Sequence, residues 1–394
     1  MKINIKKTII SLIYLFVFIS IICRMLSKVI PSSPFGLLSY MGLLIVLCLS
    51  VVYLLFGIRR KIKFDKFNFF LFLIIIYELV ISIINKSIYF PYTIIDIATW
   101  PLLIIVFNNY TKSYDIPNFI KKRLFIDYVI IFAISLILIS IHLSGKGNYG
   151  EVVFPVYYCL TFLPIILNYC EGNQIKKICI LACLLALVAS TKRTGTLAAV
   201  GGVFIYFVIE AKISNNKNLK IKKYIRLFAI VLIAMTVVYV AENNGNITVL
   251  QRLSNISEDG GSGRNLIWAD VIQSFKSSSI TEKVFGHGYQ NVYYELKPLG
   301  FDRLAHNSYI EYLYDYGYIG TILLIILLIG IIRFSFKMLR KYDKGAAPLF
   351  YSLIVTVLLS VFSYFFEQSA IILPFSILWG CCIGSFKRKE VKKC

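Results

Sequence analysis

The feature that most constrains this chain is a series of long apolar runs that are nearly free of charge. Ile9–Cys23, Leu37–Phe56 and Phe67–Ile84 are examples, and a helix needs about 20 apolar residues to cross a bilayer. Hydrophobic residues make up 58% of the 394 residues, and charged residues only 16%. Because a soluble domain cannot bury so much apolar surface, the sequence predicts an all-α polytopic bundle of transmembrane helices.

We expect about twelve spans. They are placed near residues 9–26, 35–56, 67–84, 93–107, 124–143, 152–169, 178–190, 196–209, 224–241, 309–332, 348–366 and 369–385. The first follows the opening MKINIKK and has no small-residue cleavage site. The expected organisation is nine spans in residues 1–241, one large loop in 242–308, and three spans with a basic tail in 309–394.

The basic residues predict the orientation of these spans. The formal net charge is +22, and 29 of the 42 Lys and Arg residues lie in alternate connections between the predicted spans. This is the positive-inside pattern, which predicts cytoplasmic termini and places the loop 242–308 outside. The charge therefore indicates topology, and nucleic acid is not an expected partner.

The loop 242–308 has a pattern of its own. In LIWADVIQSF (Leu266–Phe275), Ile267, Val271 and Phe275 share one helical stripe, which predicts an amphipathic helix. The following GHG (Gly286–Gly288) is typical of a turn. None of the nine cysteines lies in this loop, and no Cys/His spacing in the chain is typical of a metal site. No cofactor is expected.

Three cations are predicted on the outer face. Lys192 and Arg193, in STKRTGTLAAVGG, lie between two short apolar runs, where the positive-inside rule disfavours them, and Arg264 precedes the amphipathic helix. Interfacial snorkelling would explain Arg193, and a solvated loop charge would explain Arg264. The functional interpretation is that they hold an anion, because guanidinium matches phosphate oxygens in a bidentate way.

RLAHNSYIEYLYDYGYIG (Arg303–Gly320) brings a histidine to the start of a span. His306 and Asn307 are interpreted either as polar caps of that helix or as site residues. Glu311 and Tyr312 belong to a helical face too polar for lipid, and we expect it to line the site. Three tyrosines of the outer loop combine a flat apolar face with a polar hydroxyl: Tyr289, Tyr293 and Tyr294.

Two segments resemble the O-antigen ligase and polymerase superfamily, the Wzy/WaaL type of membrane glycosyltransferase. STKRTGTLAAVGG is similar to that family's Arg-Gly segment at an outer helix junction, although Thr194 separates Arg193 from Gly195 here. GRNLIWADVIQSF, VFGHGYQN and AHNSYIEYLYDYGYIG follow the family's order of arginine, amphipathic helix, Gly-x-Gly turn and His-Asn.

The resemblance implies a multi-pass enzyme of the bacterial cytoplasmic membrane. Its donor would be a polyprenyl-pyrophosphate-linked oligosaccharide, its acceptor a glycan, and a regulator of chain length is a further partner that the family allows. Arg193, Arg264 and Lys192 would bind the pyrophosphate in place of a metal ion. His306 would act on the acceptor hydroxyl as a base or an orienting group, and direct displacement would invert the anomeric carbon. Tyr289, Tyr293 and Tyr294 would offer their faces to sugar rings.

Polymerase and ligase reactions share this chemistry and differ in the acceptor. We favour a polymerase of repeat units (O-antigen, capsule or exopolysaccharide), because the loop shows no extra domain for a large lipid acceptor. Transfer of finished glycan to lipid A core or another surface acceptor is the alternative. A flippase or transporter would have two similar halves with charges near the midplane, whereas the halves of this chain do not match and its polar residues cluster in the outer loop. A scaffold would not depend on Arg193, Arg264 or His306.

Overall fold

The structure is a computed structural model, and it describes most of the chain. The described residues are 5–30, 33–58, 65–87, 89, 91–144, 154–190, 192–214, 264–297, 304–363, 365–366 and 369–391. Within these ranges, helices are the only regular secondary structure. The predicted all-α class is confirmed.

The first part of the chain forms a bundle of helices. In order, they are α1 (Ile5–Val29), α2 (Phe35–Ile58), α3 (Lys66–Ile84), α4 (Tyr92–Thr111), α5 (Asn118–Leu143), the short 3-10 helix η1 (Phe154–Val156), α7 (Tyr157–Tyr169), α8 (Asn173–Ala189) and α9 (Arg193–Ile213). Three short helices follow: α12 (Arg264–Ser277), α13 (Ile280–Phe285) and α14 (Asn291–Leu296). The chain then returns to the bundle in α15 (Ser308–Arg340), α16 (Ala346–Phe362) and α17 (Ser369–Val391).

The predicted spans agree well with these helices. In the described part of the chain, eight helices are long and apolar enough to cross a membrane: α1 to α5, α9, α15 and α17. Phe154–Tyr169 and α16 are shorter apolar helices. Each predicted span coincides with a described helix except 224–241, which lies outside the described residues. The chain is therefore a multi-pass membrane protein.

The core of the bundle lies between α4 and α17. In each of these two helices, 89% of the most apolar window is buried, against 39% in α2 and α3. Glycines permit this close approach, because a Cβ on Gly380 would lie 2.6 Å from the Ile104 carbonyl oxygen and one on Gly384 would lie 2.3 Å from that of Asn108. The outer helices instead expose leucine and isoleucine, as expected for contact with lipid.

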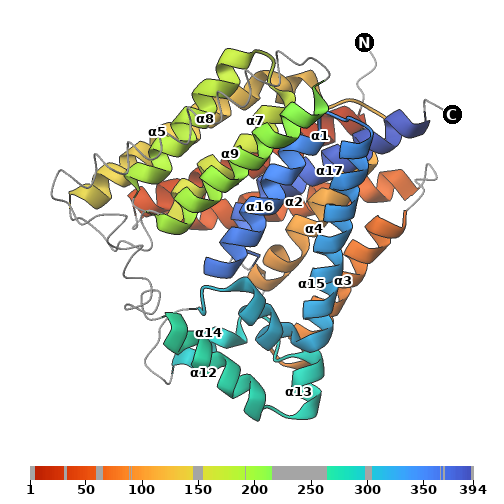
Figure 1. Cartoon of the computed structure of the whole chain (residues 1–394). Coiled ribbons are helices and arrows are strands. Elements are labelled where there is room, and N and C mark those ends of the chain that lie inside the picture. Colours follow the sequence, from red (N-terminus) through yellow and green to blue (C-terminus); the bar gives the residue numbers. More distant parts are fainter. Residues whose placement is uncertain are drawn as a thin grey trace.

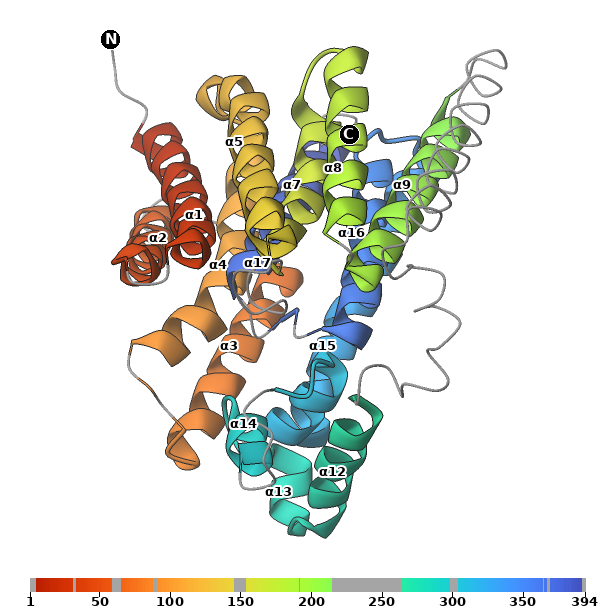
Figure 2. The same ribbon diagram turned by 90° about the vertical axis from the view of Figure 1, so that its left-hand side faces the viewer.

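Helices α12 to α14 form a small cap at one end of the bundle (Figures 1 and 2). The cap lies opposite the end where α1 begins and α17 ends, which we call the terminal end. The cap has its own hydrophobic cluster, in which the α12 stripe of Ile267, Val271 and Phe275 packs with Val292, Leu296, Ala305 and Tyr314. The predicted amphipathic helix and its buried stripe are confirmed.

A close backbone contact joins the cap to α15. The helix is interrupted at Gly317, whose φ is 62°, and the freed carbonyls of Tyr314 and Asp315 accept from the backbone N–H groups of His287 (3.2 Å) and Gly288 (2.7 Å). A Cβ on Gly286 would lie 2.4 Å from the Tyr316 Cα. These positions therefore require glycine. The interpretation of the GHG segment as a turn is confirmed.

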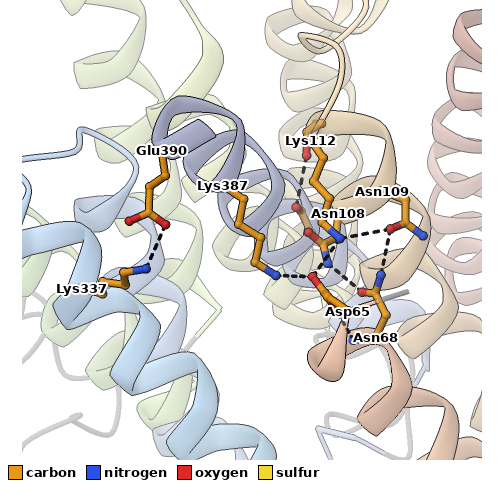
Figure 3. Close-up of polar contacts among 10 residues, drawn as sticks. Asp65, Asn68, Asn108, Asn109, Lys112, Lys337, Lys387 and Glu390 are labelled. Atoms are coloured by element: carbon orange, nitrogen blue, oxygen red, sulfur yellow. Dashed lines mark hydrogen bonds and ion pairs between the residues drawn. The ribbon is translucent and has the colours of Figure 1, made fainter. Parts of the chain in front are cut away.

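The terminal end is held by polar contacts between helices (Figure 3). Asp65 caps α3 by accepting from the Asn68 backbone N–H at 2.9 Å, and it also binds the ammonium groups of Lys112 (2.8 Å) and Lys387. The Asn68 side chain donates to Asn109 at 2.8 Å. Helices α3, α4 and α17 are thereby tied together.

Candidate active site

Arg264 begins α12 and is fastened to the bundle. Its Nη1 donates a hydrogen bond to the Phe362 carbonyl oxygen at 2.8 Å, where α16 ends. One turn later, the Trp268 indole Nε1 donates to the Ala305 carbonyl oxygen at 2.8 Å. The start of α12 thus lies between the last residue of α16 and the residue that precedes His306.

Lys192 lies near Arg264, although 72 positions separate them in the sequence. Burial and the like charge of Arg264 lower the pKa of Lys192 to about 8. Lys192 immediately precedes α9, and Arg193 is the first residue of that helix. The Arg193 side chain lies outside the described part of the structure. Two of the three predicted cations are therefore brought together at the cap end of the bundle.

His306 has a left-handed backbone conformation, with φ of 55°. This conformation is uncommon for a residue with a side chain and costs roughly 1 kcal/mol or more. The backbone N–H of His306 donates to Glu311 Oε1 at 3.0 Å, and Glu311 is fully buried. Glu311 thereby holds the backbone that carries His306, a role that the sequence pattern does not reveal.

Asn307 is the N-cap of α15. Its Oδ1 accepts from the backbone N–H groups of Tyr309 (3.0 Å) and Ile310 (3.2 Å), which otherwise lack partners in the first turn. The cap interpretation of Asn307 is confirmed, and its side-chain oxygen faces the helix. Since this oxygen is occupied by two donors, a direct contact with sugar would have to involve the amide nitrogen.

Ser308 joins the start of α15 to the turn that follows α16. Its hydroxyl accepts from the backbone N–H of Phe365 at 2.6 Å and donates to the Ser363 carbonyl oxygen at 3.3 Å. Phe362 directly precedes Ser363, and its carbonyl oxygen accepts the hydrogen bond from Arg264. The same turn therefore fixes the positions of both Arg264 and the His306 segment.

A cavity of about 10 Å³ lies among α3, α4, α15 and the GHG turn. Tyr312 donates to Glu78 Oε1 at 2.6 Å, and Tyr289 donates to Asp96 Oδ2 at 2.5 Å. Trp100, Tyr316, Ile97 and Phe366 complete the lining. A cavity of this size accommodates about one water molecule. Tyr289 and Tyr312 belong to the lining of this cavity and Glu311 does not, and their predicted role in substrate binding stays a prediction.

Arg24 interacts with Asp96, one of the residues that line this cavity, and the sequence analysis did not predict it. It belongs to α1 and interacts electrostatically with Tyr40, Tyr158 and Asp96. Its guanidinium carbon lies 5.0 Å from the centre of the Tyr40 ring. A lone arginine inside a 25-residue apolar helix was the available signal, because such a charge is costly unless it faces the bundle interior.

The three tyrosines predicted to contact sugar separate into two groups. Tyr289 is buried and bound to Asp96, as described above. Tyr293 and Tyr294 lie in α14, and Tyr294 is 44% exposed.

The His287 side chain packs against Tyr314. Its ring stacks on the Tyr314 ring with centroids 4.1 Å apart, and its Nδ1 lies 2.9 Å from the Tyr314 carbonyl oxygen. The structure thus places His287 in cap packing.

Comparison with protein families places these residues in a known context. Residues 178–325 match the family model described as O-antigen ligase. The match includes Lys192, Arg264, His306 and Glu311, and it confirms the predicted resemblance to the O-antigen ligase and polymerase family. The class of the protein is therefore a membrane protein with an O-antigen ligase-type segment. A search of curated protein sequences gives no match.

Proposed function

We propose that this protein polymerises lipid-linked oligosaccharide repeat units at the outer face of the cytoplasmic membrane. It would transfer glycan from polyprenyl pyrophosphate to a sugar hydroxyl, with both termini on the cytoplasmic side. The observation that carries the proposal is the approach of Lys192 to Arg264 within the family-matched segment. The like charges of Lys192 and Arg264 repel each other, and burial of Lys192 adds to the cost of its charge. A bound diphosphate would replace that repulsion by attraction.

The bound donor would place its pyrophosphate between Arg264, Lys192 and Arg193. These cations would stabilise negative charge as it grows on the leaving group, without movement during the reaction. The position of Arg264 is fixed, because its guanidinium donates to the Phe362 carbonyl oxygen and Trp268 anchors the start of α12. The Arg193 side chain lies outside the described part of the structure, so its proposed role rests on the sequence motif.

The acceptor hydroxyl would react beside His306. Its oxygen forms a bond to the anomeric carbon while the bond from that carbon to the pyrophosphate oxygen breaks, and the electron pair leaves with polyprenyl pyrophosphate. The hydroxyl proton passes to the His306 imidazole and then to solvent. A single displacement inverts the anomeric configuration. Tyr289 and Tyr312 would contribute hydroxyls to the cavity wall near the acceptor.

Substitution in cells tests this assignment. His306→Ala and Arg264→Ala would each be expressed in a strain that lacks the protein, with Lys337→Ala at the terminal end as control, because Lys337 is exposed and pairs with Glu390. We expect the first two variants to lose long surface glycan while single repeats persist. Glycan of normal length in both variants would refute the catalytic assignment.

The ligase reaction is the second candidate, since the matched family model is described as O-antigen ligase. The same variants distinguish it from polymerisation. If the protein is a ligase, His306→Ala cells accumulate lipid-linked polymer that never reaches its final acceptor. If it is a polymerase, the lipid-linked material stops at one repeat.

A further inference from the structure

Helix α14 has one face inside the cap and one face toward solvent. Val292 and Leu296, four residues apart, are fully buried in the hydrophobic cluster of the cap. That cluster also contains Ala305, the residue before His306. Tyr293 and Tyr294 therefore project from the other sides of a short helix whose buried face packs beside the candidate active site.

A third tyrosine joins them from a distant part of the chain. Tyr89 lies in the connection between α3 and α4, and its ring stacks on Tyr294 with centroids 5.8 Å apart and an angle of 20° between the planes. Tyr89 is 43% exposed and Tyr294 is 44% exposed. Tyr293 packs edge-on against Tyr294 at 5.4 Å. We call Tyr89, Tyr293 and Tyr294 the tyrosine platform.

The platform carries both apolar and polar recognition groups. The phenol of Tyr89, like any tyrosine, is protonated at neutral pH and can donate a hydrogen bond. Desolvation and the interaction with Tyr294 raise its pKa further, to about 12. The Lys297 ammonium lies 5.7 Å from the centre of the Tyr293 ring, where it adds a further donor. The stacking of Tyr89 on Tyr294 buries little apolar surface, because more than 40% of each side chain stays exposed.

We propose that the tyrosine platform binds the part of the glycan chain that lies away from the reacting sugar. Sugar rings present an apolar C–H face and hydroxyl edges, which match exposed aromatic faces ringed by phenol hydroxyls. The platform is separate from the buried cavity at Tyr289. This inference rests on the proposed glycan transfer and adds a second, external contact for the same substrate.

Chain length is the first test. Tyr89→Ala and Tyr294→Ala would be compared with Tyr89→Phe, which keeps the ring, and with Tyr114→Ala. Tyr114 is a matched control, because it is 40% exposed and packs on Tyr110 at 5.4 Å outside the cap. We expect the two alanine variants at the platform to shorten the modal glycan chain at least twofold. Tyr89→Phe should shorten it less, because it keeps the ring and loses only the hydroxyl, and Tyr114→Ala should keep the wild-type distribution. An unchanged distribution in Tyr89→Ala would overturn the proposal.

Direct binding separates this proposal from the proposed function. The probe is the host cell's own surface glycan, released by mild acid and sized, titrated onto the full-length protein in nanodiscs. Loss of one ring should weaken binding about 2- to 12-fold, the range that corresponds to aromatic stacking energies. His306→Ala should bind as wild type even though it transfers nothing. If Tyr89→Ala binds glycan normally but leaves the nanodisc-embedded protein less stable, the tyrosines are membrane-interface anchors and the glycan site is excluded.

Discussion

The two ends of the helix bundle use charge in opposite ways. At the terminal end, cations pair with acids: Lys337 and Lys341 bind Glu390 at 2.9 and 2.5 Å, and Lys389 binds Asp343 at 2.7 Å. At the cap end, Lys192 and Arg264 lie near each other with like charge. Paired charges hold helices together at the terminal end, and we propose that the like charges at the cap end bind an anion.

Asp65 shows what the terminal end gains from this pairing. Burial alone would raise the pKa of Asp65, but hydrogen bonds from Lys112 and Lys387 outweigh it and hold the pKa at about 2. At Lys112, however, burial outweighs the attraction of Asp65, and the pKa falls below its ordinary value. Desolvation thus offsets part of the favourable charge interaction, and the network contributes more to helix position than to net stability.

Removal of a cap-end cation should have the largest effect. Arg264→Ala should lower the glycan transfer rate by about 10²- to 10³-fold, the usual effect of removing one preorganised group that stabilises developing charge. Lys337→Ala at the terminal end should leave the rate unchanged. The measurement is consumption of lipid-linked repeats in isolated membranes. Equal rates for both variants would show that the two ends do not differ in function.

Disruption of the backbone contact between cap and bundle should have the second-largest effect. A Cβ at Gly317 would lie 2.6 Å from both the Gly286 nitrogen and the Val284 oxygen, so Gly317→Ala should destabilise the protein by about 2–4 kcal/mol. Gly330, in the same helix, has open space around it, and Gly330→Ala is the matched control. Thermal unfolding in detergent would measure both, and equal melting temperatures would contradict the contact.

The terminal-end network should show an effect on stability alone. Asp65→Asn should lower the free energy of unfolding by about 1–3 kcal/mol, because Lys112 and Lys387 lose a charged partner. Since the folded pKa of about 2 lies below the ordinary value, this contribution is complete above about pH 4 and is lost as the pH falls toward 2. Activity per folded molecule should stay unchanged. A loss of activity would show that the terminal end also contributes to function.

Lys192 should give the smallest effect, visible only in alkaline solution. With a pKa of about 8 it loses its proton above that pH, and a bound diphosphate would raise the pKa. The donor KM should therefore rise by up to about tenfold per pH unit above pH 8. Lys192→Arg keeps its charge, so its donor KM should stay flat across this range. Parallel pH profiles would exclude Lys192 from donor binding.

The sequence predicted the elements with a strong local signal. Apolar runs gave the helices, because lipid-facing segments need length and low charge, and the stripe in Leu266–Phe275 gave α12 with its buried residues. The sequence also placed His306 at the entrance to α15. Local patterns could not show that Glu311 holds the His306 backbone, or that Ser308 binds the turn after α16. These hydrogen bonds depend on the folded positions of the groups and produce no periodic pattern in the sequence.

The sequence by itself determined that the chain is a helical membrane protein with a family-matched polar segment, since hydropathy and residue order are properties of the chain alone. Only the tertiary structure decided which polar groups meet. It brought Arg24 toward Asp96, Tyr89 onto Tyr294 and Lys192 toward Arg264. These encounters depend on how the helices pack, and packing is fixed by the summed contacts of many residues rather than by any one motif.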